Sequence, residues 1–165
     1  MNPEQNEGLK QFEIVEIDDT LAERIRIEFR QEAFDHLRFR EVGISFASME
    51  GENIAGFISL TWKEFPYTFE EPPKEAYIDI LEVRPEYRRQ GIAKKLIDKC
   101  ESVARTENCY QLRSWSSEDK TEAIAMWKKY NFGMNPQTIV SGRTGENVNG
   151  YFVTKPIEGE ENGEK

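Results

Sequence analysis

The chain has 165 residues, a length that suits one domain with its own core, and its 10 Phe, 6 Tyr and 3 Trp argue against disorder. With 31 acidic and 22 basic residues, its net charge of −9 disfavours a nucleic-acid partner and mildly favours a cationic substrate. No apolar run is long enough for a membrane span and the polar start is unlike a secretory signal, so we expect a cytoplasmic protein that binds no membrane.

We expect one folded domain over residues 11–155. Residues 1–10 are polar and are predicted to be flexible, and the acidic tail over 156–165 lacks an apolar pattern and is predicted to be disordered. Two cysteines provide neither a disulfide framework nor a set of metal ligands, and the one histidine, His36, adds little to such a set. We therefore expect no metal, and we expect Cys100 and Cys109 to be reduced and packed.

In chain order, the first half begins with a strand that is followed by a helix, a hairpin and a loop. A capping-box pattern over residues 20–23 and apolar residues at every fourth position predict one helix that ends near Phe34. Alternating apolar residues on either side of a turn at 50–52 predict the hairpin. Residues 63–74 contain three prolines and show no period, which predicts a loop. The strands of this half are predicted over residues 11–17, 44–49 and 53–62.

The second half alternates strands and helices before a closing hairpin. Residues 76–83 form a predicted strand that Pro85 ends, and an apolar stripe over 92–104 predicts a helix. A further helix is predicted over 121–130. The remaining strands are predicted over residues 111–116, 133–140 and 148–154. This order predicts an α/β (α+β) fold with a mixed sheet of about seven strands and helices on both faces.

The turn over residues 88–93, RRQGIA, lies directly between a predicted strand and the start of a predicted helix. The first N–H groups of a helix are unpaired, and Gly91 and Ala93 leave room for a phosphate to approach them. Arg88 and Lys94 add positive charge in an otherwise acidic chain. The spacing fits neither a dinucleotide-binding loop nor a P-loop, so the turn is either a polyanion site of another kind or an ordinary connection with surface arginines.

Two segments resemble the GNAT superfamily of N-acetyltransferases. The family signature is V-x-P followed by [RQ]-x-x-G-x-[GA], and residues 123–132 resemble the family's A-x-x-x-Y-x-x-x-G-F segment. The signature residues here are Val83, Pro85, Arg88, Gly91 and Ala93. The resemblance implies the GNAT fold, with acetyl-CoA bound between two strands that splay apart, here 76–83 and 111–116. It also implies an acyltransferase that works as a monomer or a homodimer.

The resemblance further implies which residues hold acetyl-CoA. A backbone amide near Glu82 would polarise the thioester carbonyl, and the amides of the turn would hold the pyrophosphate beside an arginine side chain. Lys120 stands where the family has an asparagine that touches the pantetheine arm, and Asn131 replaces a glycine. The implied cofactor-binding residues are Leu81, Val83, Arg88, Arg89, Gln90, Gly91, Ile92, Ala93, Lys94, Lys120 and Trp127.

Trp127 stands where the family has the tyrosine that often protonates the leaving thiolate. An indole N–H donates a hydrogen bond but is not a useful acid, so Trp127 is expected either to form the wall of the thioester channel or to fill the core. Tyr130, one helical turn further on, is a candidate acid or a core residue. Because a thiol has a pKa of about 8.5, the amine proton or water is an alternative source.

The expected acceptor is a cationic primary amine, carried by a small molecule or a peptide. Such an amine has a pKa of about 10.4 and is almost fully protonated at pH 7, so a carboxylate must take its proton, directly or through water. Asp79 and Glu82 are the candidate bases, or else solvated and helix-pairing acids. Three positions apart, they lie on opposite faces of a regular strand, unless a bulge between them changes this.

The acceptor pocket is expected to use the segment after the hairpin, or else this segment packs on its own aromatic residues. Its apolar and acidic side chains are Trp62, Glu64, Phe65, Tyr67, Phe69, Glu70 and Glu71. The helix around residues 30–40 would line the other side. Two functions remain open: an acetyl-CoA-dependent N-acetyltransferase, or an acyl-CoA-binding sensor on the same fold that does not turn over.

Overall fold

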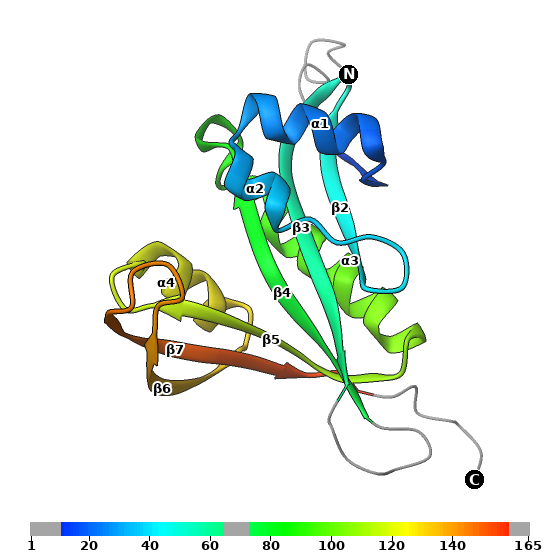
Figure 1. The fold of residues 1–165 in the computed structure, drawn as a ribbon. Coiled ribbons are helices and arrows are strands. Elements are labelled where there is room, and N and C mark those ends of the chain that lie inside the picture. The colour runs from blue at the N-terminus through cyan, green and yellow to red at the C-terminus, as the bar shows by residue number, and fades with distance from the viewer. Residues whose placement is uncertain (1–10, 65–72, 159–165) are drawn as a thin grey trace, which may run out of the picture.

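A computed structural model of the chain describes residues 11–64 and 73–158. Within them, seven strands form one mixed sheet in the order β1-β2-β3-β4-β5-β7-β6, with helices on both faces (Figure 1). The strands are β1 (Glu13–Glu16), β2 (Gly43–Glu50), β3 (Asn53–Glu64), β4 (Lys74–Val83), β5 (Cys109–Ser117), β6 (Gly133–Val140) and β7 (Asn147–Pro156). The helices are α1 (Asp19–Glu28), α2 (Gln31–Asp35), the 3₁₀ helix η2 (Pro85–Tyr87), α3 (Ile92–Thr106) and α4 (Thr121–Lys129). The predicted mixed sheet and its helical layers are confirmed.

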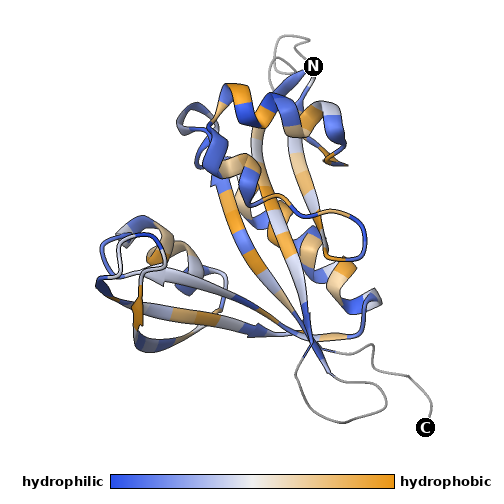
Figure 2. Ribbon diagram, in the orientation of Figure 1, coloured by the Kyte–Doolittle hydropathy of each residue, from blue (hydrophilic) through white to orange (hydrophobic). Residues whose placement is uncertain are grey.

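Two apolar clusters hold the helices against the sheet. On one face α3 buries Leu96 and Ile97, and α4 adds its own apolar side to the same cluster. On the other face α1 and α2 cover a cluster that contains Ile25 and Phe57. Figure 2 shows the apolar residues along β2, β3 and β4 that these helices cover. Among the described residues, no helix is long and apolar enough to cross a membrane.

The helix predicted to end near Phe34 is two helices, so this prediction is wrong. α1 begins two residues earlier than the capping box suggests, because Asp18 and not Thr20 accepts a hydrogen bond from the N–H three residues later, at 2.8 Å. After α1 the Phe29 ring packs edge-on against the Phe57 ring, with the centroids 4.9 Å apart. Arg30 has an extended backbone, and α2 starts after it.

Strand ends also differ from the predictions. β1 is shorter than predicted, whereas β3 and β4 extend into the predicted loop, which leaves residues 65–72 outside the described part. β7 includes Pro156, and the Ile157 N–H donates to the Tyr110 carbonyl at 2.9 Å. The predicted disordered tail therefore does not begin at residue 156. The predictions for 1–10 and 159–165 fall outside the described residues.

β4 and β5 are parallel neighbours only over residues 74–77 of β4. At this junction Glu75 is 3% exposed and accepts hydrogen bonds from Arg113 Nε and Gln111 Nε2, both at 2.9 Å. The Arg113 guanidinium also lies 4.9 Å from the centre of the Phe152 ring on β7. A buried carboxylate held from β5 thus joins the two strands at one end.

Replacing Glu75 with glutamine should lower the free energy of unfolding by about 3 kcal/mol, because it leaves the Arg113 guanidinium without its buried charged partner. Urea denaturation of the two proteins measures the difference. Glu23→Gln is the control, since it removes an exposed pair with Arg26 on α1 and should change stability far less. Equal losses in the two variants would contradict a special role for the junction.

Candidate active site

Beyond the junction, β4 and β5 separate and form a V-shaped opening in the sheet (Figure 1). β4 stays paired with β3 as far as Val83, and β5 stays paired with β7 as far as Ser117. The last link across the V is the Ser114 hydroxyl, which donates to the Ile78 carbonyl at 2.9 Å. The predicted splayed strand pair is therefore confirmed, and the edges of both strands are open beyond this point.

A β-bulge places Asp79 on β4. The register with β3 passes from Ile78 directly to Ile80, so no β3 residue pairs with Asp79. An extra residue of this kind shifts the alternation of the side chains that follow. Asp79 and Glu82 consequently both contact side chains from the segment that joins α1 to β2. The bulge required to bring the two candidate bases to one face is present.

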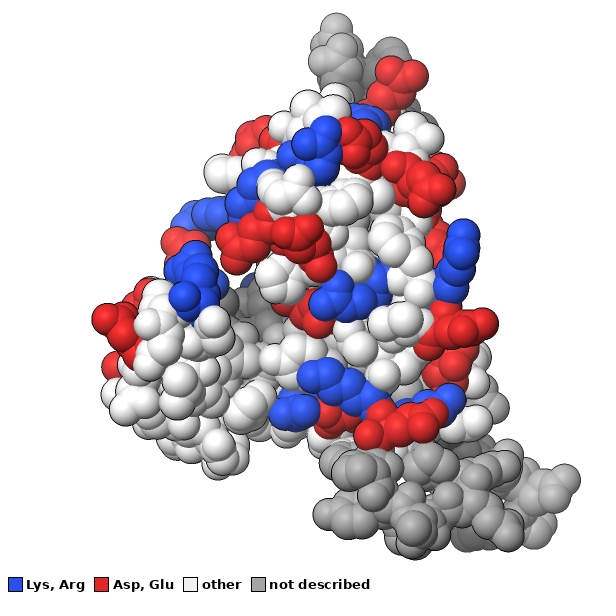
Figure 3. Space-filling model, viewed as in Figure 1, with Lys and Arg blue, Asp and Glu red and all other residues white. Residues whose placement is uncertain are grey.

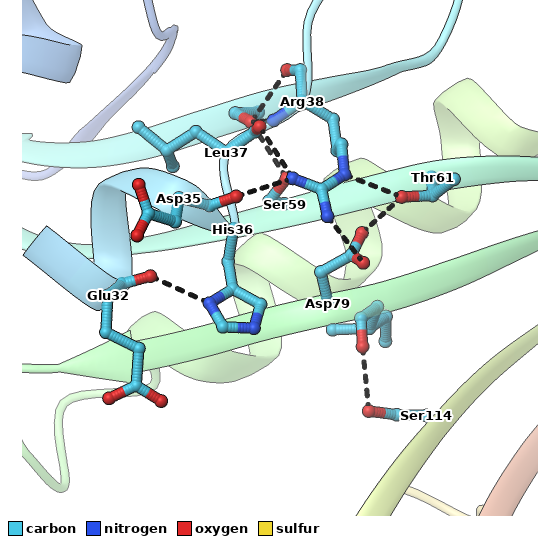
Figure 4. A network of polar contacts seen from close by, with 11 residues as sticks. Glu32, Asp35, His36, Leu37, Arg38, Ser59, Thr61, Asp79 and Ser114 are labelled. Carbon is cyan, nitrogen blue, oxygen red and sulfur yellow. Dashed lines mark hydrogen bonds and ion pairs between the residues drawn. The ribbon is translucent and has the colours of Figure 1, made fainter. Parts of the chain in front are cut away.

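Asp79 lies in a network of polar contacts (Figure 4). Its Oδ2 accepts a hydrogen bond from the Thr61 hydroxyl at 2.6 Å, and Arg38 Nη2 lies 3.6 Å from its Oδ1. The side chain is 11% exposed, and this burial raises the pKa of the carboxyl group above its usual value, although Thr61, Arg38 and His36 act in the opposite direction. A raised pKa suits a proton acceptor at neutral pH, because it moves the pKa toward the operating pH.

Glu82 is held differently. Arg30 Nη1 donates to both of its carboxylate oxygens, at 2.7 and 2.9 Å, so that the break between α1 and α2 is tied to β4. Because Arg30 already engages both oxygens of Glu82, this carboxylate is less available to an incoming amine proton. Of the two predicted candidates, Asp79 therefore has the more suitable surroundings for accepting a proton.

His36 lies close to Asp79, although the sequence analysis gave it no role. Its Nδ1 is 2.7 Å from the Glu32 carbonyl oxygen. Since a carbonyl only accepts, Nδ1 carries a hydrogen and donates it to this oxygen. Figure 4 shows the ring between Glu32 and Asp79. The turn that places His36 here follows the break between α1 and α2, which the sequence pattern did not reveal.

The turn after β4 presents a row of backbone N–H groups. Arg89 and Gly91 have left-handed backbones, with φ of 62° and 77°, and Gly91 caps α3. The first backbone hydrogen bond of α3 runs from the Lys95 N–H to the Gly91 carbonyl, at 3.1 Å. In the described part of the chain, the N–H groups of residues 89–93 thus donate to no backbone carbonyl. A Cβ at Gly91 meets no atom within 4 Å, so the space beside this residue is open.

The predicted cofactor residues lie along the V and at the helix start beside it. Arg88 is 54% exposed and reaches across to Glu122 on α4, with 3.6 Å between the charged atoms. Lys120 is the residue before α4 and is exposed. The others are Leu81 and Val83 on β4, Arg89, Gln90 and Gly91 in the turn, Ile92, Ala93 and Lys94 at the start of α3, and Trp127 on α4.

Trp127 is 4% exposed and belongs to the apolar cluster on the α3 face. Its ring centre lies 4.7 Å from that of Phe132, and its indole N–H donates to Ser116 Oγ on β5 at 2.9 Å. Tyr130 is half-buried against the same cluster. The link between Trp127 and Ser116 joins α4 to the open arm of β5, and no pattern in the sequence indicated it.

The predicted acceptor segment is described only in part, because Phe65, Tyr67, Phe69, Glu70 and Glu71 lie outside the described residues. Trp62 and Glu64 line a cavity of about 360 Å³ with Lys74 and Glu107. This cavity flanks the paired end of β4 and β5, away from the turn. Among the described residues, no group of three or more His, Cys, Asp or Glu side chains is placed to hold a metal ion.

Residues 11–132 match the sequence profile of the acetyltransferase (GNAT) family. No curated protein sequence matches the chain. Arabidopsis thaliana NAA60 in complex with acetyl-CoA superposes with a TM-score of 0.74 at 19% identity, over 90% of this chain and 100% of that chain. The Escherichia coli ribosomal-protein-S18-alanine N-acetyltransferase superposes with a TM-score of 0.67 at 17% identity, over 92% of this chain and 98% of that chain. Vibrio cholerae spermidine/spermine N-acetyltransferase SpeG, in complex with manganese ions, has a TM-score of 0.65 at 15% identity, over 89% of this chain and 93% of that chain. At these identities the similarity establishes a shared fold.

Burial of Asp79 should make the stability of the protein depend on pH. The unfolded carboxyl group titrates near pH 3.9. Because the folded pKa is raised, the folded state loses stability as the pH rises from about 4 through that raised pKa. Asp79→Asn, which cannot ionise, should therefore be more stable than the wild type at pH 7 and nearly equal to it near pH 4. Thermal unfolding across this range measures the difference, and a less stable variant at pH 7 would contradict the dominance of burial.

Proposed function

This chain belongs to the acetyltransferase (GNAT) family, and we propose that it transfers an acetyl group from acetyl-CoA to a primary amine of a small-molecule or peptidyl acceptor. One observation carries the proposal: the V between β4 and β5 opens beside a turn whose backbone N–H groups are free in the described structure. An anion site and a gap in the sheet at one place suit a ligand with a pyrophosphate and a long thin arm.

The turn would bind the pyrophosphate. Free N–H groups over residues 89–93 and the positive end of α3 favour an anion, and Gly91 lets it approach the backbone. The exposed Arg88 side chain, which contacts Glu122 in this structure, would exchange that partner for a phosphate oxygen. The pantetheine arm would then pass between the strands, with the thioester carbonyl accepting a hydrogen bond from a β4 amide between Leu81 and Val83.

The acceptor amine would approach from the α1 and α2 face. Its ammonium gives one proton to the Asp79 carboxylate, directly or through water, and the neutral nitrogen attacks the thioester carbonyl carbon. The carbon–sulfur bond then breaks, its electron pair stays on sulfur, and the second amine proton neutralises the thiolate. In this scheme Glu82 orients Arg30, and Tyr130 stays a candidate acid beside the cofactor.

A cationic acceptor fits the net charge of the chain. Figure 3 shows a group of Asp and Glu side chains near α2, with Lys and Arg side chains around it on the same face. The net charge of −9 attracts cations in general. The E. coli and V. cholerae relatives are named for a protein alanine and for spermidine or spermine, respectively, so amines of both kinds belong in a substrate panel.

Acetyl-CoA should raise the melting temperature of the wild type, and Gly91→Glu should abolish this shift, because it puts a bulky anion where the phosphates approach the backbone. Gly51→Glu is a matched control: Gly51 also has a left-handed φ of 57° and open space around it, but lies in the turn between β2 and β3. Both variants carry similar backbone strain. If Gly91→Glu folds and retains the full shift, the phosphate site lies elsewhere.

Asp79→Asn should lower turnover by about 10²- to 10⁴-fold and flatten the acidic limb of the pH–rate profile, because the variant lacks the proton acceptor. Glu82→Gln should retain that limb. Release of CoA thiol in the presence of spermidine or an alanine-terminated peptide measures both. A flattened limb in Glu82→Gln alone would assign the role of base to Glu82. The alternative of a non-catalytic sensor is suggested by the indole of Trp127, and binding of acetyl-CoA without thiol release from any amine would favour it.

A further inference from the structure

Ser116 has a buried hydroxyl group with one hydrogen bond made and one unmade. Trp127 Nε1 lies 2.9 Å from Ser116 Oγ, and an indole N–H only donates, so Oγ is the acceptor in this bond. The hydroxyl hydrogen must therefore point elsewhere. Ser116 is 5% exposed, and among the described residues no acceptor receives that hydrogen. A buried donor without an acceptor is costly, so this one indicates a missing partner.

Ser114 shows where that partner belongs. Ser114 and Ser116 are two residues apart on β5, and therefore project to the same side of the strand. Ser114 lies where the two strands still touch, and its hydroxyl donates to the Ile78 carbonyl of β4 at 2.9 Å. Ser116 lies beyond that link, where β5 is paired with β7 alone. For Ser114 the acceptor comes from β4. At Ser116 the two strands have parted, so the corresponding position lies in the opening of the V.

We propose that the Ser116 hydroxyl donates a hydrogen bond to the sulfur atom of CoA, and that Trp127 is a positioning residue that holds Ser116 Oγ for this purpose. The inference rests on the proposed function, since it requires the thioester to occupy the V. A donor to sulfur stabilises the negative charge that develops there as the carbon–sulfur bond breaks.

The step is a hydrogen bond and not a proton transfer. A serine hydroxyl is far less acidic than a thiol, whose pKa is about 8.5, so Ser116 keeps its hydrogen when the thiolate forms. The electron pair of the broken bond stays on sulfur, and the proton that neutralises it comes from the amine nitrogen. Trp127 lacks an acidic hydrogen and takes no part in that proton transfer. Its contribution would be to fix the direction of the Ser116 hydroxyl.

The pKa of the CoA thiol in the bound complex tests this directly, without turnover. Ultraviolet absorbance of the thiolate is followed during pH titration of CoA bound to saturating protein. The wild type should hold this pKa below about 8.5, and Ser116→Ala should raise it by about one unit. Ser116→Thr, which keeps the hydroxyl and suits a strand, should restore it, while Ser114→Ala should leave the bound thiol pKa as in the wild type.

Kinetics provide a second readout. Ser116→Ala should lower kcat by about tenfold, matching one pKa unit, with little change in the KM for acetyl-CoA. Trp127→Phe should give a smaller rise in the thiol pKa, because Ser116 keeps its hydroxyl but the bond that orients this hydroxyl is lost. If Ser116→Ala fails to fold, Trp127→Phe still tests the proposed hydrogen bond to sulfur. CoA binding with the same thiol pKa in wild type and Ser116→Ala would overturn this inference alone. Failure of the wild type to bind CoA would overturn the proposed function.

Discussion

The separation of β4 from β5 is the constraint on which the rest of this structure depends. Open strand edges leave backbone groups unpaired, so two neighbouring strands part only where each is held by something else. Here β3 holds β4, β7 holds β5, and the buried Glu75 with Arg113 closes the end where they meet. Pairing between β4 and β5 ends beyond this junction. In the proposed reaction, a ligand anchored at the α3 start uses this gap to meet a second ligand on the α1 and α2 face.

The bulge at Asp79 decides what faces that meeting point. One extra residue turns both carboxylates of β4 toward α1 and α2, and two arginines then give them different surroundings. Glu82 receives two hydrogen bonds from Arg30, whereas Asp79 is more buried and its pKa is raised by that burial. Ionising a buried carboxyl group costs folding free energy, so the feature that suits Asp79 to proton transfer also opposes the stability of the fold.

Local patterns predicted most of the strands, the helix after the turn and the turn itself, because apolar periodicity and the R-x-x-G-x-A sequence are short-range signals. They did not predict the break after α1, since apolar residues continue at helical spacing through Phe29 while contacts with Phe57 and Glu82 end the helix there. The bulge depends on register with β3, which a single strand does not specify. The contacts of His36 and Ser116 depend in the same way on tertiary structure.

The two sides of the proposed chemistry then belong to different strands of the V, with the proton acceptor on β4 and the donor to sulfur on β5. Each group is placed by a partner behind it: Thr61 and Arg38 behind Asp79, and Trp127 behind Ser116. The proposed arrangement gives a physical reason why a tryptophan can stand in α4 at the position where the family pattern has a tyrosine. An indole cannot protonate a thiolate, but its rigid ring and single N–H hold a neighbouring hydroxyl, which on our proposal donates into the gap between β4 and β5.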